Sequence, residues 1–298
     1  MALAGACVAA TALASAAVAD TPPPAGHEIK VFPARDSVVG RGYAADLPAI
    51  VSVLRYDAEA AAFAVVSRSE PILPQDDPDT PGFDGIVAVN LADGGCWRRV
   101  TPDIAAGDRV RIVQRDAAGA VLTNDSTITG SVTAAAPKVV FDSARKRYFA
   151  EVKGSAPRIT LGTGQPVEGA RVPLSQLQVR IVNDDGFATN GRRALVTSED
   201  GTLRYDSADP ADARWTARFP VKAIDVAEVE AGVTRAMWLG RDPAAGTETT
   251  VFEDRAGGIE GGPRAGCSAP AEDDPQAEVA PAAGAVEDDV PADVELAE

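Results

Sequence analysis

Few side chains in this chain of 298 residues could perform catalysis. It contains a single histidine, His27. A Ser-His-Asp or Cys-His mechanism needs a histidine held beside its nucleophile, and no G-x-S-x-G motif accompanies His27. Zinc and copper sites that use several histidines lack their ligands for the same reason. Carboxylates are plentiful, so composition alone leaves a glycosidase-type pair open. The favoured interpretation is that the protein is not an enzyme and that His27 lies at the rim of a sheet.

Two oxygen-rich loops are the candidate metal sites. One loop contains Asp76, Asp77, Asp79 and Asp84, and a second contains Asn183, Asp184 and Asp185. Such loops at the end of a β-sandwich can bind calcium. Neither has the EF-hand spacing, and Asp, Asn and Gly are also common turn residues. Calcium is therefore the one cofactor that we consider.

Tryptophan rings are the candidate ligand platforms. Trp215 alternates with Ala217 and Phe219, which predicts a core position. Trp97 follows a Gly-Gly turn, so it is the one ring among them that is a candidate for exposure and for stacking on a sugar, with burial as the alternative.

The two ends of the chain differ from its middle. Residues 1–19 carry no charge and end in Ala17-Val18-Ala19, which predicts a secretory signal peptide, although no Lys or Arg precedes the apolar run. Residues 20–26 form a Pro-rich linker. Residues 268–298 contain ten acids and no Lys or Arg, so residues 255–298 are predicted to be a disordered acidic tail. The expected location is secreted or extracellular, associated with the cell surface.

Charge and cysteines limit the partners and the compartment. The net charge is −16 and there is no basic stripe, which argues against nucleic-acid binding. No transmembrane segment is predicted. Removal of the signal peptide would leave Cys96 and Cys267, which would tend to pair in an oxidising compartment. Free thiols and an intermolecular bond remain alternatives.

Short alternating runs separated by turns dominate the region between the ends. They predict strands at residues 29–31, 49–56, 61–66, 86–91, 110–112, 121–122, 126–133, 148–154, 177–181, 193–198, 203–206, 214–219, 234–240 and 247–253. One short helix is expected at residues 225–231, and no longer helical stripe occurs. The predicted fold is all-β, with β-sandwich domains at 27–135 and 138–254 joined near residues 134–137.

The second domain resembles secreted bacterial immunoglobulin-like and fibronectin type III-like modules. The matching segments are Val152-Lys153-Gly154-Ser155-Ala156, Leu177-Gln178-Val179-Arg180-Ile181, Tyr205-Asp206, Trp215-Thr216-Ala217-Arg218-Phe219 and Thr249-Thr250-Val251-Phe252-Glu253. The first domain is similar to the same class more loosely, and it lacks the paired cysteines of antibody domains.

This resemblance implies a spacer, an adhesion module or a carbohydrate-binding accessory. The leading hypothesis is a non-catalytic secreted or cell-surface protein whose partner is an extracellular protein or a cell-wall glycan. A glycan-binding accessory module and a calcium-stabilised adhesin domain are the alternatives.

Overall fold

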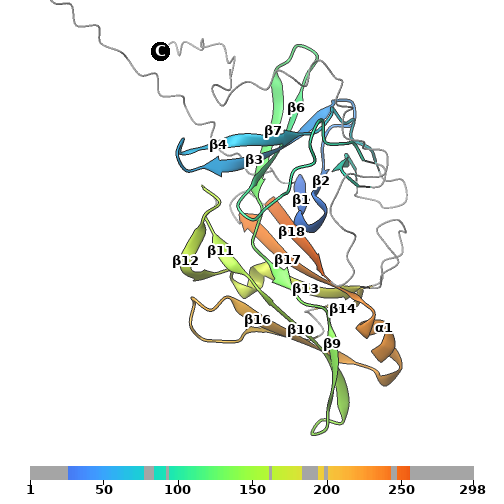
Figure 1. Cartoon of the computed structure of the whole chain (residues 1–298). Helices are drawn as coiled ribbons and strands as arrows, with labels where there is room; N and C mark the ends of the chain where they lie inside the picture. Colours follow the sequence, from blue (N-terminus) through green and yellow to red (C-terminus); the bar gives the residue numbers. More distant parts are fainter. Residues whose placement is uncertain are drawn as a thin grey trace, which may run out of the picture.

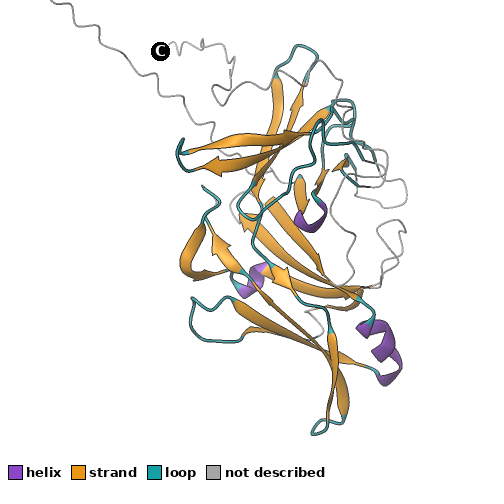
Figure 2. Ribbon diagram, viewed as in Figure 1, coloured by secondary structure: helices purple, strands orange, loops and turns teal. Residues whose placement is uncertain are grey.

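A computed structural model describes residues 26–76, 84–91, 94–160, 163–182, 194–197, 201–242 and 247–255. The described chain is mostly β-sheet, with several antiparallel sheets and one α-helix (Figures 1 and 2). The all-β prediction is therefore confirmed, whereas the immunoglobulin-like type of the sandwiches remains a prediction. No helix in this part of the chain has the length and apolar character needed to span a bilayer.

The largest sheet joins strands from both ends of the described chain. Its order is β14 (Ala194–Thr197), β13 (Leu177–Val182), β17 (Val233–Asp242), β18 (Thr247–Arg255), β1 (Glu28–Phe32), β2 (Ser37–Arg41) and β5 (Val87–Val89). β1 pairs in parallel with β18, placing Glu28 opposite Glu248 and Val31 opposite Val251. This sheet therefore contains strands from both predicted domain ranges, and the domain boundaries remain a prediction.

The second sheet is antiparallel and comes entirely from the first half of the chain. Its order is β4 (Ala62–Arg68), β3 (Ala49–Asp57), β6 (Arg109–Arg115) and β7 (Val121–Ile128). Asp57 closes the β3–β4 hairpin by accepting the backbone N–H groups of Glu59 and Ala60. Asp116 closes the β6–β7 hairpin in the same way, as expected for aspartate in a tight turn.

The third sheet has five strands and comes mostly from the second half of the chain. β15 (Thr202–Tyr205), β16 (Arg214–Val221), β10 (Arg147–Ser155) and β8 (Thr133–Ala134) lie in that order, and β9 (Lys138–Asp142) also pairs with β10. β11 (Pro157–Ile159) and β12 (Pro166–Arg171) form a separate two-stranded sheet. The helix α1 (Val226–Glu230) contacts β9 and β10, and single 3-10 turns lie at Pro33–Arg35, Leu174–Gln176 and Ala223–Asp225.

Two hydrophobic clusters form the core. The first contains Ile29, Val51 and Ile112, and the second contains Val179, Trp215 and Phe219, all fully buried. Trp215 occupies the core position that its alternation predicts. Trp238, in the second cluster, is only 8% exposed, and its indole N–H donates to the side chain of Gln176.

The predicted strands are largely present, with differences of detail. β2, β9, β11 and β12 are additional strands that alternation did not predict. Residues 121–122 and the first part of 126–133 belong to one continuous strand, β7, which pairs with β6 along its length. The expected junction at 134–137 begins inside β8, whose Ala134 pairs with Gly154 of β10.

Candidate functional site

The outward surface of the five-stranded sheet is the candidate site. Along β10, Tyr148, Ala150 and Val152 face the second cluster, so the alternate side chains face outward. The same alternation applies to β16, where Trp215, Ala217 and Phe219 face inward. We call the outward surface the arginine face and define it by Lys138, Val140, Asp142, Arg145, Arg147, Phe149, Glu151, Lys153, Arg204, Thr216, Arg218 and Pro220.

Three arginines surround one aromatic ring at the centre of this face. The strand register places Phe149 between Val140 of β9 and Pro220 of β16. The guanidinium carbons of Arg145, Arg147 and Arg218 lie 5.8, 4.9 and 4.7 Å from its ring centroid. The ring face attracts cations, which explains why Phe149 is only 8% exposed although it points away from the core.

Carboxylates neutralise only some of these cations. Glu151 lies 3.3 Å from Lys153 and 3.7 Å from Arg218. Asp142 pairs with Arg145 at 3.2 Å, and hydrogen bonding from the Arg145 backbone, with the nearby guanidinium, lowers the pKa of Asp142.

Other cations on the arginine face have no carboxylate partner among the described residues. Lys138, Arg147 and Arg204 are exposed and form no ion pair with a described residue. The face thus has an excess of positive charge, although the whole chain carries −16.

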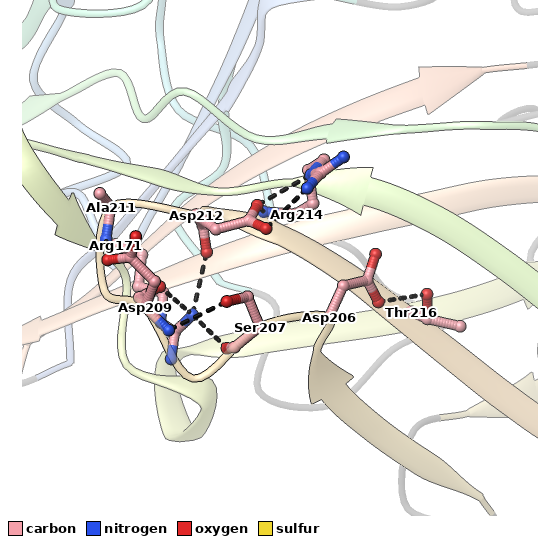
Figure 3. Close-up of polar contacts among 8 residues, drawn as sticks. All are labelled: Arg171, Asp206, Ser207, Asp209, Ala211, Asp212, Arg214 and Thr216. Atoms are coloured by element: carbon pink, nitrogen blue, oxygen red, sulfur yellow. Dashed lines mark hydrogen bonds and ion pairs between the residues drawn. The ribbon is translucent and has the colours of Figure 1, made fainter.

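Beside the face, the loop between β15 and β16 is held by an arginine (Figure 3). One Nη of Arg171 donates to the carbonyls of Ser207, Asp209 and Asp212, each at 2.9 Å. The guanidinium of Arg171 also stacks 4.0 Å over the ring of Tyr205. Because one donor group binds three carbonyl groups of the same loop, this loop forms a preorganised rim.

Two further contacts anchor the rim to β16. Asp212 accepts two hydrogen bonds from the guanidinium of Arg214, at 2.8 and 2.7 Å, and these bonds lower the pKa of Asp212 to about 2. Asp206 accepts a 2.7 Å hydrogen bond from the hydroxyl of Thr216, which lies on the arginine face (Figure 3).

His27 lies in a separate polar cluster between two sheets. Its Nδ1 lies 2.7 Å from Oδ2 of Asp125, a β7 side chain that is only 4% exposed. Its ring lies 4.8 Å from the ring of Tyr43. Burial and the neighbouring Asp125 carboxylate raise the pKa of the Tyr43 hydroxyl. This cluster joins the strand that follows His27 to β7, which fits a structural role at a sheet rim.

The predicted calcium loop is only partly described. The Oδ1 of Asp76 accepts the backbone N–H of Gly85 at 2.9 Å, so this carboxylate closes the loop. The carbonyl of Asp84 accepts the N–H of Gly42, and Asp77 and Asp79 lie outside the described residues. Asn183, Asp184 and Asp185 also lie outside them. Within the described ranges no group of three or more His, Cys, Asp or Glu residues could hold a metal ion.

Trp97, the candidate for an exposed ring, is buried. Its side chain is 7% exposed and belongs to the first hydrophobic cluster. Its indole N–H donates to the carbonyl of Asp36 at 2.8 Å. The Gly-Gly turn before it predicted a surface position, but the 3-10 turn at Pro33–Arg35 brings the Asp36 carbonyl over the ring edge. A buried ring with a satisfied donor offers no platform for a sugar.

Cys96 is disulfide-bonded. No other cysteine occurs among the described residues, so its partner lies outside them, and the chain contains only Cys7 and Cys267 besides. The Cys96–Cys267 bond therefore remains a prediction.

Comparison of the chain with protein-family models and with curated proteins finds no match. The arginine face is the feature that the sequence analysis missed. Its signal is the run Arg145-Lys146-Arg147-Tyr148-Phe149, in which three cations are followed by two aromatic residues at the start of a strand. The third arginine, Arg218, joins them only through the β10–β16 pairing.

Proposed function

We propose that the protein is a secreted, non-catalytic binding protein, built from immunoglobulin-like or fibronectin-like sandwich modules, that binds an anionic polysaccharide at the arginine face. The observation that carries the proposal is the gathering of Arg145, Arg147 and Arg218 around Phe149, beside cations that pair with no carboxylate in the part of the chain that the structure describes. Guanidinium groups bind carboxylates in bidentate pairs, so a polymer of acidic sugars offers complementary groups.

The shape of the surface favours a polymer over a small anion. The cations lie on four neighbouring strands, from Lys138 on β9 to Arg204 on β15. Each exposed contact contributes little by itself, so several carboxylates on one chain are needed for useful affinity. A signal-like N-terminus supports an extracellular partner of this kind.

The test is binding of alginate, a carboxylated polysaccharide, to the full chain at low salt. We expect alginate to bind and neutral dextran not to bind. The double variant Arg147→Gln/Arg218→Gln should lower alginate affinity about tenfold or more, because two charge-assisted contacts are lost. The matched control, Arg68→Gln/Arg115→Gln, removes two exposed arginines from the four-stranded sheet and should leave affinity unchanged.

Two results would reject the proposed function. One is equal affinity of both double variants for alginate. The other is single-stranded DNA binding as tightly as alginate, because that would indicate general attraction of polyanions rather than recognition of a polysaccharide.

A further inference from the structure

We infer that the acidic segment of this same chain, residues 268–298, docks on the arginine face and competes there with external anions. The inference rests on the proposed function in one respect, namely that the face binds carboxylates. It adds the identity of an occupant that is always present.

Charge complementarity is the first argument. Residues 268–298 contain ten acids and no Lys or Arg, so every charged side chain in the segment suits a surface of exposed cations. The segment also contains Pro and Ala but almost no large apolar residue. Its contacts with protein are therefore chiefly electrostatic. For such contacts the arginine face offers Lys138, Arg147 and Arg204, which form no ion pair with a described residue.

The path of the chain is the second argument. The last described strand, β18, ends at Arg255, opposite Thr234 of β17. Thr234 follows α1 closely, and α1 contacts β9 and β10. Val226 and Val229 of α1 pack against the second cluster, so the helix lies on the inward side of the β9–β10 hairpin. The chain therefore leaves the described structure near β9, an edge strand of the sheet whose outward side is the arginine face (Figure 1).

Reach does not limit the contact. The stretch from Arg255 to residue 268 spans up to about 45 Å when extended. If Cys267 is the partner of Cys96, the segment starts at Cys96 instead, and its remaining length of roughly 100 Å when extended is still ample. Covalent attachment gives the segment an effective concentration on the order of millimolar, so weak contacts suffice for occupancy.

Occupancy by this segment would set a threshold for external ligands. A polysaccharide must displace it, so the segment lowers apparent affinity and excludes short or weakly charged anions. Attraction between exposed charges falls with added salt, so the docked state should be lost at high ionic strength.

The direct test is carbodiimide cross-linking of the full chain, which joins lysine amines to carboxylates in contact with them. Cross-linked monomer is isolated, digested and analysed by mass spectrometry. We expect residues 268–298 to be joined to Lys138, Lys146 and Lys153 at low salt and not at 0.5 M NaCl. Lys30, on β1 beside Glu28, is the internal control and should not be joined to the segment.

A matched variant links docking to binding. Glu272→Gln/Asp273→Asn/Asp274→Asn removes three charges from the segment and leaves the described fold untouched. It should lower the cross-link yield and raise alginate affinity severalfold. Cross-links to Lys30 as abundant as those to the face, or none to the face, would overturn the inference.

The two proposals fail differently. Cross-links to the face without alginate binding would keep this inference and reject the polysaccharide. Alginate binding without cross-links, and without change in the segment variant, would keep the proposed function and reject the docked segment.

Discussion

At the scale of single residues, arginines and aspartates do most of the positioning work in the described structure. Arg171 fixes the β15–β16 loop, and Arg55 holds the buried Asp108 through two 2.8 Å hydrogen bonds. Gln114, which is 1% exposed, donates to the carbonyls of Ala44 and Leu47 at 2.9 and 2.7 Å. Such side chains let irregular segments keep one conformation where strand pairing is absent.

Asp212 offers a direct check on the rim of the face. Arg214→Gln removes the guanidinium that lowers its pKa, so this pKa should rise from about 2 towards the ordinary value of about 3.9. Because the folded pKa lies below the unfolded one, the pair stabilises the protein above that ordinary value, and its contribution is lost as pH falls towards 2. Carboxyl NMR titration measures the shift. An unchanged pKa in the variant would contradict the assigned contact.

The His27–Asp125 pair gives a second residue-scale prediction. His27→Ala leaves a buried carboxylate without its imidazole partner and should lower the free energy of unfolding by about 2 kcal/mol at pH 7. Burial already raises the pKa of Asp125, and His27 opposes that rise.

The variant should therefore raise the pKa of Asp125 further. A carboxyl whose folded pKa lies above its unfolded pKa destabilises the fold as pH rises from the unfolded pKa through the folded one. The loss of unfolding free energy caused by His27→Ala should therefore shrink below about pH 3.9. Urea unfolding at several pH values tests this, and His27→Ala/Asp125→Asn should recover part of the loss. A pH-independent loss would rule out the charge as its cause.

At the scale of elements, alternation predicted the strands whose inward residues are apolar, such as β3, β10 and β13. It failed for β9, because Val139, Val140 and Phe141 are consecutive and show no polar alternation. It also failed for β2, because one of its inward positions is Gly40, which has no apolar side chain to mark the pattern. Glycine is needed there, since a Cβ would lie 2.6 Å from the side chains of Ile112 and Tyr43. The arginine face could not be predicted, because it depends on the register of β9, β10 and β16, which the sequence pattern leaves open.

Gly154 shows how closely the elements pack. A Cβ there would lie 1.9 Å from the carbonyl oxygen of Thr133 and 2.3 Å from Cζ2 of Trp215. Gly154→Ala must therefore shift β8 or the indole, and we expect it to cost about 3 kcal/mol of stability. Gly119→Ala is the comparison, since nothing lies within 4 Å and only its φ of +87° adds strain, about 1 kcal/mol. Thermal unfolding compares the two, and equal losses would contradict the tight contact.

At the scale of the whole molecule, the parallel pairing of β1 with β18 connects the two hydrophobic clusters through one sheet. Loops also meet, since Gly107 and Gly164 approach so closely that a Cβ on either would lie 2.4 Å or less from the other's carbonyl oxygen. The sequence predicted two tandem domains, and it carried no signal that the first strand pairs with the last described one, because long-range pairing leaves no local pattern.

Coupled unfolding of the clusters follows from this pairing. Val31→Ala removes buried side-chain volume from β1 and should lower stability by about 2 kcal/mol. Trp97 reports on the first cluster, and Trp215 and Trp238 report on the second. A Trp97→Phe background therefore isolates the signal of the second cluster, and a Trp215→Phe/Trp238→Phe background isolates that of the first. Fluorescence should give coincident urea midpoints that shift together. Separate midpoints would show that the clusters unfold independently.

The most direct measurement of the central claim is arginine footprinting with phenylglyoxal on the full chain, with and without alginate. Binding at the arginine face predicts that Arg147 and Arg218 are protected when alginate is present, whereas Arg68 and Arg115 react at unchanged rates. Equal reactivity of Arg147 and Arg218 under both conditions, while alginate is bound, would contradict the account and place the binding site elsewhere.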